Sequence, residues 1–246
     1  MAKCAEPTDR HSQGYYEQTR RPLPSLILVA AMLFFFHLGS VFYGSYQDLR
    51  TPQYLGDFFI WLGAPAGFFP AIAVMGVLLV LCFAHRDKWD LHLPVFIGII
   101  VESILWTIPL VAASLLTARI AASTGTMAHR LFVQKMLLAA GASVYEEFLF
   151  RLVLIGGLLL VLVDLMHLKK GPMTVLAIIV SAGLFSLCHF SFANGPYTFR
   201  WNEFIFLAIA GAGWGALFLF RGLGIAVGSH FAWNLFAMLA VQTQNP

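Results

Sequence analysis

The sequence predicts an all-α protein: a polytopic transmembrane helix bundle of about seven, at most eight, helices around an intramembrane polar cavity. Of its 246 residues, 59% are hydrophobic and 11% are charged, and the mean hydropathy is +0.79. Soluble domains carry about 25% charged residues, so a chain this apolar needs lipid as its solvent. The cavity is predicted because ionisable residues lie inside the apolar segments, where a charged side chain costs about 2.5–3.5 kcal/mol on insertion scales.

The chain divides into a polar, basic N-terminal tail, residues 1–24, and one membrane domain, residues 25–246. About 20 apolar residues span a bilayer, so this length leaves no room for a separate soluble domain. Prolines and glycines before residue 70 make the start of the second helix uncertain. An eighth span at 58–67 is therefore kept as an alternative. The expected helices are 25–43, 70–84 (or from 58), 94–116, 128–166, 173–189, 203–220 and 225–241.

Charge and cysteine content exclude several classes of protein. The formal net charge of +3 is small and no basic aromatic surface accompanies it, so no nucleic-acid partner is expected. Over alternating loops, Lys and Arg are more frequent on the side of the N-terminus, which predicts a cytoplasmic N-terminus. Cys4, Cys82 and Cys188 lack CxxC spacing, so neither a disulfide framework nor a zinc knuckle is expected. We interpret Cys82 and Cys188 as small buried apolar residues.

The helix expected at 128–166 carries three charged residues where lipid should surround it. Glu147 and Arg151 are four residues apart with the acid first, so they can pair along one face of the helix. Glu146 projects about 100° away and has no partner in its own helix. A carboxylate in lipid must be protonated or find a partner on another helix. Glu147 and Arg151 are therefore expected to clamp the helix, and Glu146 to reach across the bundle.

Two later helices offer partners for Glu146. Phe185 and His189 share one face of the first, and His230 and Asn234 share one face of the second. A cavity that gathers Glu146 with these polar residues would form a hydrolytic site. Glu146 and His189 would hold and deprotonate a water, and His189 would later return a proton to the leaving amine. His230 and Asn234 would donate hydrogen bonds to the oxyanion, a contribution of about 3–4 kcal/mol per donor elsewhere.

These three motifs, in this order and each on its own helix, resemble the CAAX prenyl protease and bacteriocin-processing (CPBP, or Abi) family. The resemblance covers residues 141–239, with no departure at Glu146-Glu147…Arg151, Phe185…His189 or His230…Asn234. It implies an intramembrane endopeptidase in which Glu146 and His189 activate water and His230 and Asn234 stabilise the oxyanion. The compact chain without a large insertion is similar to prokaryotic members, which implies the plasma (inner) membrane. The implied substrates are prenylated CAAX-type tails, bacteriocin or pheromone precursors, or other membrane-associated peptides.

Metal dependence stays open at this point. Glu146, His189 and His230 could supply three zinc ligands and leave one position open. The signature His-Glu-x-x-His is absent, and Asn234 suits an oxyanion donor better than a ligand. We therefore favour a mechanism without a cofactor over a zinc mechanism. Membrane lipid and a peptide or lipidated-protein substrate are the expected partners, and no oligomeric state is predicted.

Two other classes of function also fit the pattern. A non-catalytic immunity or scaffold protein would keep the motifs for stability, and a proton-coupled transporter would use Glu and His as a proton relay. Glu102 is a second intramembrane acid, interpreted as an accessory cavity residue or a partner for Arg119. His37 is expected to be satisfied in a helix interface. Gly211 and Gly215 predict a close helix contact.

Overall fold

The computed structural model confirms the all-α bundle. It describes residues 14–43, 57, 60, 68–87, 89–90, 92–116, 131–190 and 199–240. These residues contain no strand, and every helix expected from the sequence is present among them. Six of the described helical segments are long and apolar enough to cross a membrane, and α4 is apolar but shorter. The extra span considered at 58–67 lies outside the described residues except for Ile60.

The helix bounds differ from the expected ones by a few residues. The long fourth span is one continuous helix that changes between α and π geometry: α6, π-helical turns at Phe148–Ile155, α7, and further π-helical turns at Leu160–Leu165. The helices are α1 (Tyr15–Arg20), α2 (Pro22–Tyr43), α4 (Phe69–Ala84), α5 (Leu93–Leu116), α6 (Phe132–Glu147), α7 (Gly156–Leu159), α8 (Lys170–Cys188), α9 (Trp201–Arg221) and α10 (Leu223–Ala240).

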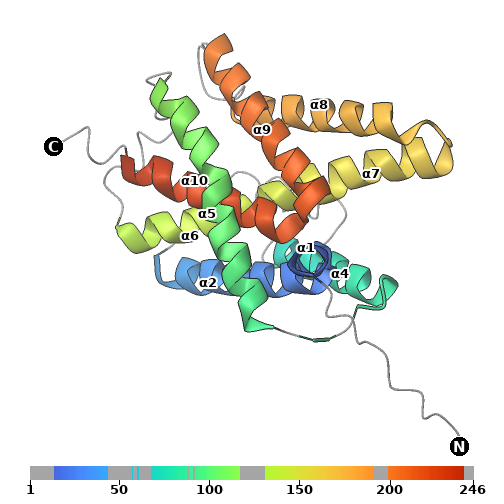
Figure 1. The fold of residues 1–246 in the computed structure, drawn as a ribbon. Coiled ribbons are helices and arrows are strands. Elements are labelled where there is room, and N and C mark those ends of the chain that lie inside the picture. Colours follow the sequence, from blue (N-terminus) through green and yellow to red (C-terminus); the bar gives the residue numbers. More distant parts are fainter. Residues whose placement is uncertain are drawn as a thin grey trace, which may run out of the picture.

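The core lies where α2, α6 and α10 run side by side, with α5 crossing α10 (Figure 1). Leu138 and Tyr145 of α6 are completely buried there, together with Phe36 of α2 and Val227 of α10. The π-helical continuation of α6 leaves this layer and packs against α8, which in turn packs along α9. The helix that carries the acidic motif thus contacts both groups of helices.

His37 of α2 is satisfied in a helix interface, as the sequence predicts. Its Nε2 atom lies 2.8 Å from the hydroxyl oxygen of Tyr145 on α6.

The segment expected to be a polar tail contains α1, which the sequence reading missed. Thr19 of α1 is 1% exposed, and the hydroxyl group of Tyr15 donates a 2.8 Å hydrogen bond to Glu102 Oε2 on α5. Partial desolvation of this hydroxyl group, and then its hydrogen bond to Glu102, raise the pKa of Tyr15 above its ordinary value. A six-residue polar helix is too short to show a hydrophobic period, so only its tertiary contacts reveal it.

Glu102 is the centre of what we call the Glu102 cluster, formed with Tyr15, Trp106 and Arg221. Arg221, at the end of α9, lies 2.5 Å through Nε and 2.6 Å through Nη2 from the two carboxylate oxygens of Glu102. Trp106 Nε1 donates to the same carboxylate at 3.2 Å. The expectation that Glu102 is an accessory residue of the cavity is therefore wrong, and the alternative partner Arg119 lies outside the described residues.

A one-residue turn joins α9 to α10 and determines how far along the bundle His230 and Asn234 lie. Gly222 has a φ of 93°, and a Cβ atom there would lie 2.8 Å from the carbonyl oxygen of Thr19. Glycine meets both demands because it has no Cβ atom. The next helix starts at once with Leu223, and Gly224 N donates to Ser25 Oγ at 2.9 Å. This anchoring of α10 against α2 positions His230 two turns into the bundle.

Candidate active site

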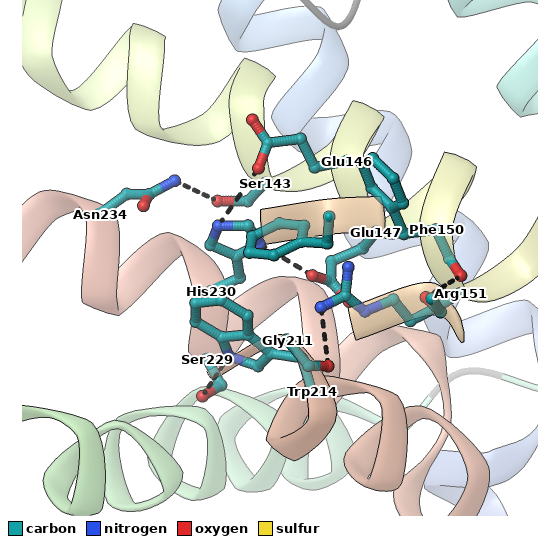
Figure 2. Close-up of polar contacts among 12 residues, drawn as sticks. Ser143, Glu146, Glu147, Phe150, Arg151, Gly211, Trp214, Ser229, His230 and Asn234 are labelled. Atoms are coloured by element: carbon teal, nitrogen blue, oxygen red, sulfur yellow. Dashed lines mark hydrogen bonds and ion pairs between the residues drawn. The ribbon is translucent and has the colours of Figure 1, made fainter. Parts of the chain in front are cut away.

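The base of the site is an ion pair within one helix, as the sequence predicts. Arg151 Nε lies 3.0 Å from Glu147 Oε2, and both side chains are 0% exposed. Arg151 Nη2 also donates to the carbonyl oxygen of Gly211 on α9 at 3.0 Å (Figure 2). A Cβ atom at Gly211 would lie 3.1 Å from Phe185 Cδ1 and 3.3 Å from Ala182 Cα. The predicted close contact at Gly211 is confirmed, and the pair ties its own helix to α9.

His230 is held by Glu147, a contact that the sequence reading did not foresee. Its Nδ1 atom lies 2.8 Å from Glu147 Oε1, and the side chain is 2% exposed. A carboxylate accepts hydrogen bonds, so Nδ1–H donates to Glu147. The other ring nitrogen, Nε2, then faces Glu146, with 3.6 Å between it and Oε2. Glu147 therefore both pairs with Arg151 and orients an imidazole of α10.

His189 approaches Glu146 from the end of α8. The helix ends at Cys188, and His189 Nδ1 donates to the carbonyl oxygen of Phe185 at 2.8 Å. Because the carbonyl accepts, Nε2 is the basic nitrogen of the neutral ring, and it lies 3.9 Å from Glu146 Oε2. The His189 side chain is 29% exposed. Cys188 is exposed rather than buried, so its interpretation as a buried apolar residue is wrong, whereas Cys82 is buried as expected.

Glu146 thus lies between two imidazoles without a direct hydrogen bond to either. Hydrogen bonds of this type have heavy-atom distances of about 2.7–3.2 Å. The measured separations of 3.6 and 3.9 Å exceed that range. Its side chain is 15% exposed, and Oε2 is buried with no hydrogen-bond partner among the described residues. This oxygen is available to bind a further polar group.

Asn234 lies one turn beyond His230 and points to Ser143 of α6 (Figure 2). Its Nδ2 atom donates to Ser143 Oγ at 3.4 Å. The Ser143 hydroxyl donates in turn to the carbonyl oxygen of Ala139 at 2.7 Å, which leaves its lone pairs to accept from Asn234. Among the described residues, the amide of Asn234 donates only this hydrogen bond, so its second N–H can donate to another acceptor. Ser143 was not identified from the sequence, because a serine in a helix is usually satisfied by its own backbone.

Two aromatic side chains enclose the histidines. Phe185 is 1% exposed; its ring centroid lies 4.6 Å from that of His189 and 5.8 Å from that of His230. The guanidinium of Arg151 lies over the Phe185 ring at 4.7 Å. Trp214 of α9 stacks on His230 with a centroid distance of 4.0 Å and an angle of 16°. Phe185 was expected in a supporting role; Trp214 was missed, although it lies in the small-residue segment 211–215 that predicted a close helix contact.

The structure therefore brings Glu146, His189 and His230 together and places Asn234 one turn further along α10. The residues come from α6, the end of α8 and α10, and α9 supplies the supporting contacts. Among the residues that the structure describes, no three His, Cys, Asp or Glu side chains form a group that could hold a metal ion as they stand. What the arrangement offers is a buried carboxylate, a basic imidazole and two potential hydrogen-bond donors in one place.

Comparison with known families agrees with this site. Residues 128–236 match the model of a family described as type II CAAX prenyl endopeptidase, Rce1-like. This core is Rce1-like. The match confirms the resemblance inferred from the three motifs and begins upstream of residue 141, where that resemblance was placed. A search of curated proteins and a search of solved structures each gave no significant match.

The family match and the apolar helices support a class for the protein at a coarse level. Its helices are those of an integral membrane protein, and residues 128–236 are similar to a family of type II CAAX prenyl endopeptidases. All four candidate catalytic residues lie within the matched segment. So do the supporting residues Glu147, Arg151, Phe185 and Trp214.

Proposed function

We propose that the chain is an intramembrane endopeptidase that hydrolyses a peptide bond of a membrane-associated substrate with a water activated by Glu146 and His189. Prenylated CAAX-type tails and bacteriocin- or pheromone-like precursors are the substrate classes to test first. The observation that carries the proposal is the environment of Glu146. Its Oε2 atom is buried, lacks a hydrogen bond among the described residues and faces the Nε2 atoms of two histidines.

Glu146 and His189 act on the water in this scheme. A water bound to Glu146 Oε2 would also lie within reach of His189 Nε2, which is basic because Nδ1 donates to Phe185. Glu146 accepts one proton as the water oxygen attacks the substrate carbonyl carbon. Glu146 then passes this proton to His189 Nε2, and His189 delivers it to the nitrogen of the leaving amine as the C–N bond breaks, which returns both side chains to their starting states. The products are a carboxylic acid and an amine, and the added atoms are those of one water.

His230 and Asn234 stabilise the oxyanion. A His230 ring with protons on both nitrogens donates Nδ1–H to Glu147 and Nε2–H to the oxyanion. The free N–H of Asn234 supplies the second donor. Donors fixed in advance of the reaction, in a site with little water, each contribute about 3–4 kcal/mol in known hydrolases. Arg151 pairs with Glu147 and keeps its carboxylate aligned with His230.

Zinc is the alternative to a cofactor-free site, because two imidazole nitrogens and a carboxylate are ligands that this metal accepts. The two mechanisms share residues and differ in their response to metal removal. Chelation abolishes cleavage by a zinc enzyme and leaves a glutamate-type enzyme unaffected.

The test is cleavage in detergent of a farnesylated CAAX peptide and a small panel of precursor peptides. Wild type, Glu146→Ala and Asp164→Asn are compared, each with and without a zinc chelator. Asp164 lies in the same continuous helix but is exposed, so its variant controls for the loss of a carboxylate. We expect cleavage by wild type and Asp164→Asn with or without chelator, and none by Glu146→Ala.

Other outcomes separate the alternatives. Loss of wild-type cleavage in chelator, restored by added zinc, would establish the metal mechanism. Cleavage by Glu146→Ala at the wild-type rate would remove Glu146 from the chemistry. If wild type cleaves none of the peptides while Glu146→Ala keeps its biological activity, the protein is an immunity or scaffold protein. Flux driven by a pH gradient in liposomes would identify a transporter.

A further inference from the structure

We propose that Trp214 is a positioning residue of the site: its indole face holds the His230 imidazole in the plane that aims Nε2 at Glu146. This inference rests on the proposed peptidase function for its consequence in catalysis. The ordering of His230 by Trp214 does not depend on that function and can be measured without it.

The contact between the two rings is close and nearly parallel. Their centroids are 4.0 Å apart and their planes meet at 16°. Trp214 is 2% exposed and His230 is 2% exposed, so neither ring can turn into open space. Phe185 closes the arrangement with edge contacts to Trp214 at 5.8 Å and to His230 at 5.8 Å. Figure 2 shows the indole of α9 beneath the imidazole of α10.

The indole is itself held by its neighbours. Trp214 Nε1 donates to Ser229 Oγ at 3.4 Å, and Ser229 directly precedes His230 on α10. The carbonyl oxygen of Ser229 accepts a hydrogen bond from Thr107 Oγ1 of α5 at 3.1 Å. On the α9 side, Gly211 lies one turn before Trp214 and accepts from Arg151. The stacked pair is therefore attached to three neighbouring helical segments.

A single hydrogen bond does not determine the direction of an imidazole. The contact between His230 Nδ1 and Glu147 fixes one point of the ring, and the ring can still swing about that point. Stacking on a flat surface fixes the plane. With the attachment of the ring to Cβ, the Nδ1 contact and the ring plane all determined, Nε2 is confined to the position in which it faces Glu146. Trp214 also presents its electron-rich face to a ring that must carry positive charge when it donates from both nitrogens.

The competing interpretation is that Trp214 only fills the core. Replacing a large buried aromatic ring by a smaller side chain lowers stability wherever the ring lies, so a loss of stability alone cannot decide between the two interpretations. Trp233 provides the matched control. It is also on the inner side of the bundle, 6% exposed, and packs on Phe206 and Phe236 rather than on His230.

The experiment compares Trp214→Phe, Trp214→Leu and Trp233→Leu with wild type in detergent. First, the ring signals of His230 are recorded by NMR on protein with ¹³C-labelled histidine, assigned with His230→Gln. The indole ring current should shift these signals upfield in wild type. Trp214→Leu should remove that shift and broaden the signals, Trp214→Phe should keep a reduced shift, and Trp233→Leu should leave them unchanged.

Second, peptide cleavage is measured for the folded fraction of each variant. Trp214→Leu should lower kcat on the order of 100-fold with little change in KM, because misplacement of a catalytic group acts on the transition state. Trp214→Phe should recover most of the rate, and Trp233→Leu should keep the wild-type kcat despite a similar loss of stability.

The two readouts separate failure of this inference from failure of the proposed function. Wild-type cleavage together with an unchanged kcat in Trp214→Leu would overturn the positioning role and leave the peptidase intact. If wild type cleaves no peptide, the proposed function fails, and the His230 signals still decide: signals unaltered by Trp214→Leu would overturn the inference.

Discussion

Glu102 and Glu146 are two carboxylates within the helices that differ in whether their oxygens are hydrogen-bonded. Glu102 receives hydrogen bonds from Tyr15, Trp106 and Arg221 at 2.5–3.2 Å. Glu146 Oε2 lies 3.6 Å from His230 Nε2 and 3.9 Å from His189 Nε2, and this buried oxygen lacks a hydrogen bond in the described part of the chain. The sequence presents both as unexplained acids in apolar segments.

The difference separates a structural acid from a chemical one. A fully paired carboxylate has no lone pair left for a water or a substrate. The hydrogen bonds of Glu102 instead hold α1, α5 and α9 together. A carboxylate that lies between two imidazoles without a hydrogen bond to either can still bind a water or a substrate. Buried polar groups are normally satisfied, so an unsatisfied one needs an explanation, and at this position the catalysis that we propose would supply it.

The largest expected effect tests this distinction directly. Glu146→Gln should lower kcat about 10²- to 10⁴-fold, the usual contribution of a general base. The free energy of unfolding should not fall, because the amide replaces a carboxylate that makes no hydrogen bond through its buried oxygen. Cleavage kinetics and SDS-titrated unfolding on the same preparation measure both quantities. A loss of unfolding free energy as large as that expected for Glu102→Gln would contradict the distinction between the two acids.

The next effect concerns the buried ion pair beneath the site. Arg151→Met should lower the free energy of unfolding by about 3–5 kcal/mol, because it leaves Glu147 buried without its counter-ion. Arg200→Met is the matched control. Arg200 pairs with Glu203 near the start of α9 with its side chain 52% exposed, and such surface pairs contribute about 0–1 kcal/mol. Equal losses in the two variants would show that burial does not determine the value of the pair.

A smaller change is expected at the paired acid. Glu102→Gln should lower the free energy of unfolding by about 1.5–3 kcal/mol, the value of hydrogen bonds to a charged group. It should also free α1, which limited proteolysis after Arg20 or Arg21 would report. The kcat of peptide cleavage should stay at the wild-type value, because the Glu102 cluster and the site share no residue. A large loss of kcat in the folded fraction would contradict this separation.

The smallest effect sharpens the description of the site. Ser143→Ala removes the acceptor of one Asn234 N–H without touching Glu146. The loss of one neutral hydrogen bond corresponds to about 0.5–1.5 kcal/mol, so kcat should fall by about two- to tenfold with stability nearly unchanged. Steady-state kinetics measure the change, and Ser143→Thr, which keeps the hydroxyl group, should restore the rate. Full activity in Ser143→Ala would show that Asn234 is oriented by other contacts.

Much of the fold could be predicted from composition and local pattern. Lipid as solvent requires apolar segments of known length, so the helices α2, α5, α8, α9 and α10 begin and end near the expected residues. The short α1 could not be predicted, because its position depends on Tyr15 and Thr19 meeting residues far away in the sequence. Arg221 could not be predicted as a partner of Glu102 for the same reason, because it is 119 residues away along the chain.

The sequence by itself determined which residues are the candidates for the chemistry. Helical periodicity placed Glu147 with Arg151, and the cost of a lone carboxylate in lipid required Glu146 to meet His189 or His230. Only the tertiary structure decided how they meet. Which ring nitrogen faces Glu146, the second role of Glu147 as the acceptor for His230, and the stacking of Trp214 all follow from the packing of α9 and α10 against α6 and its π-helical continuation. Periodicity acts within one helix, whereas these contacts depend on the rotation and height of separate helices, which no local pattern encodes.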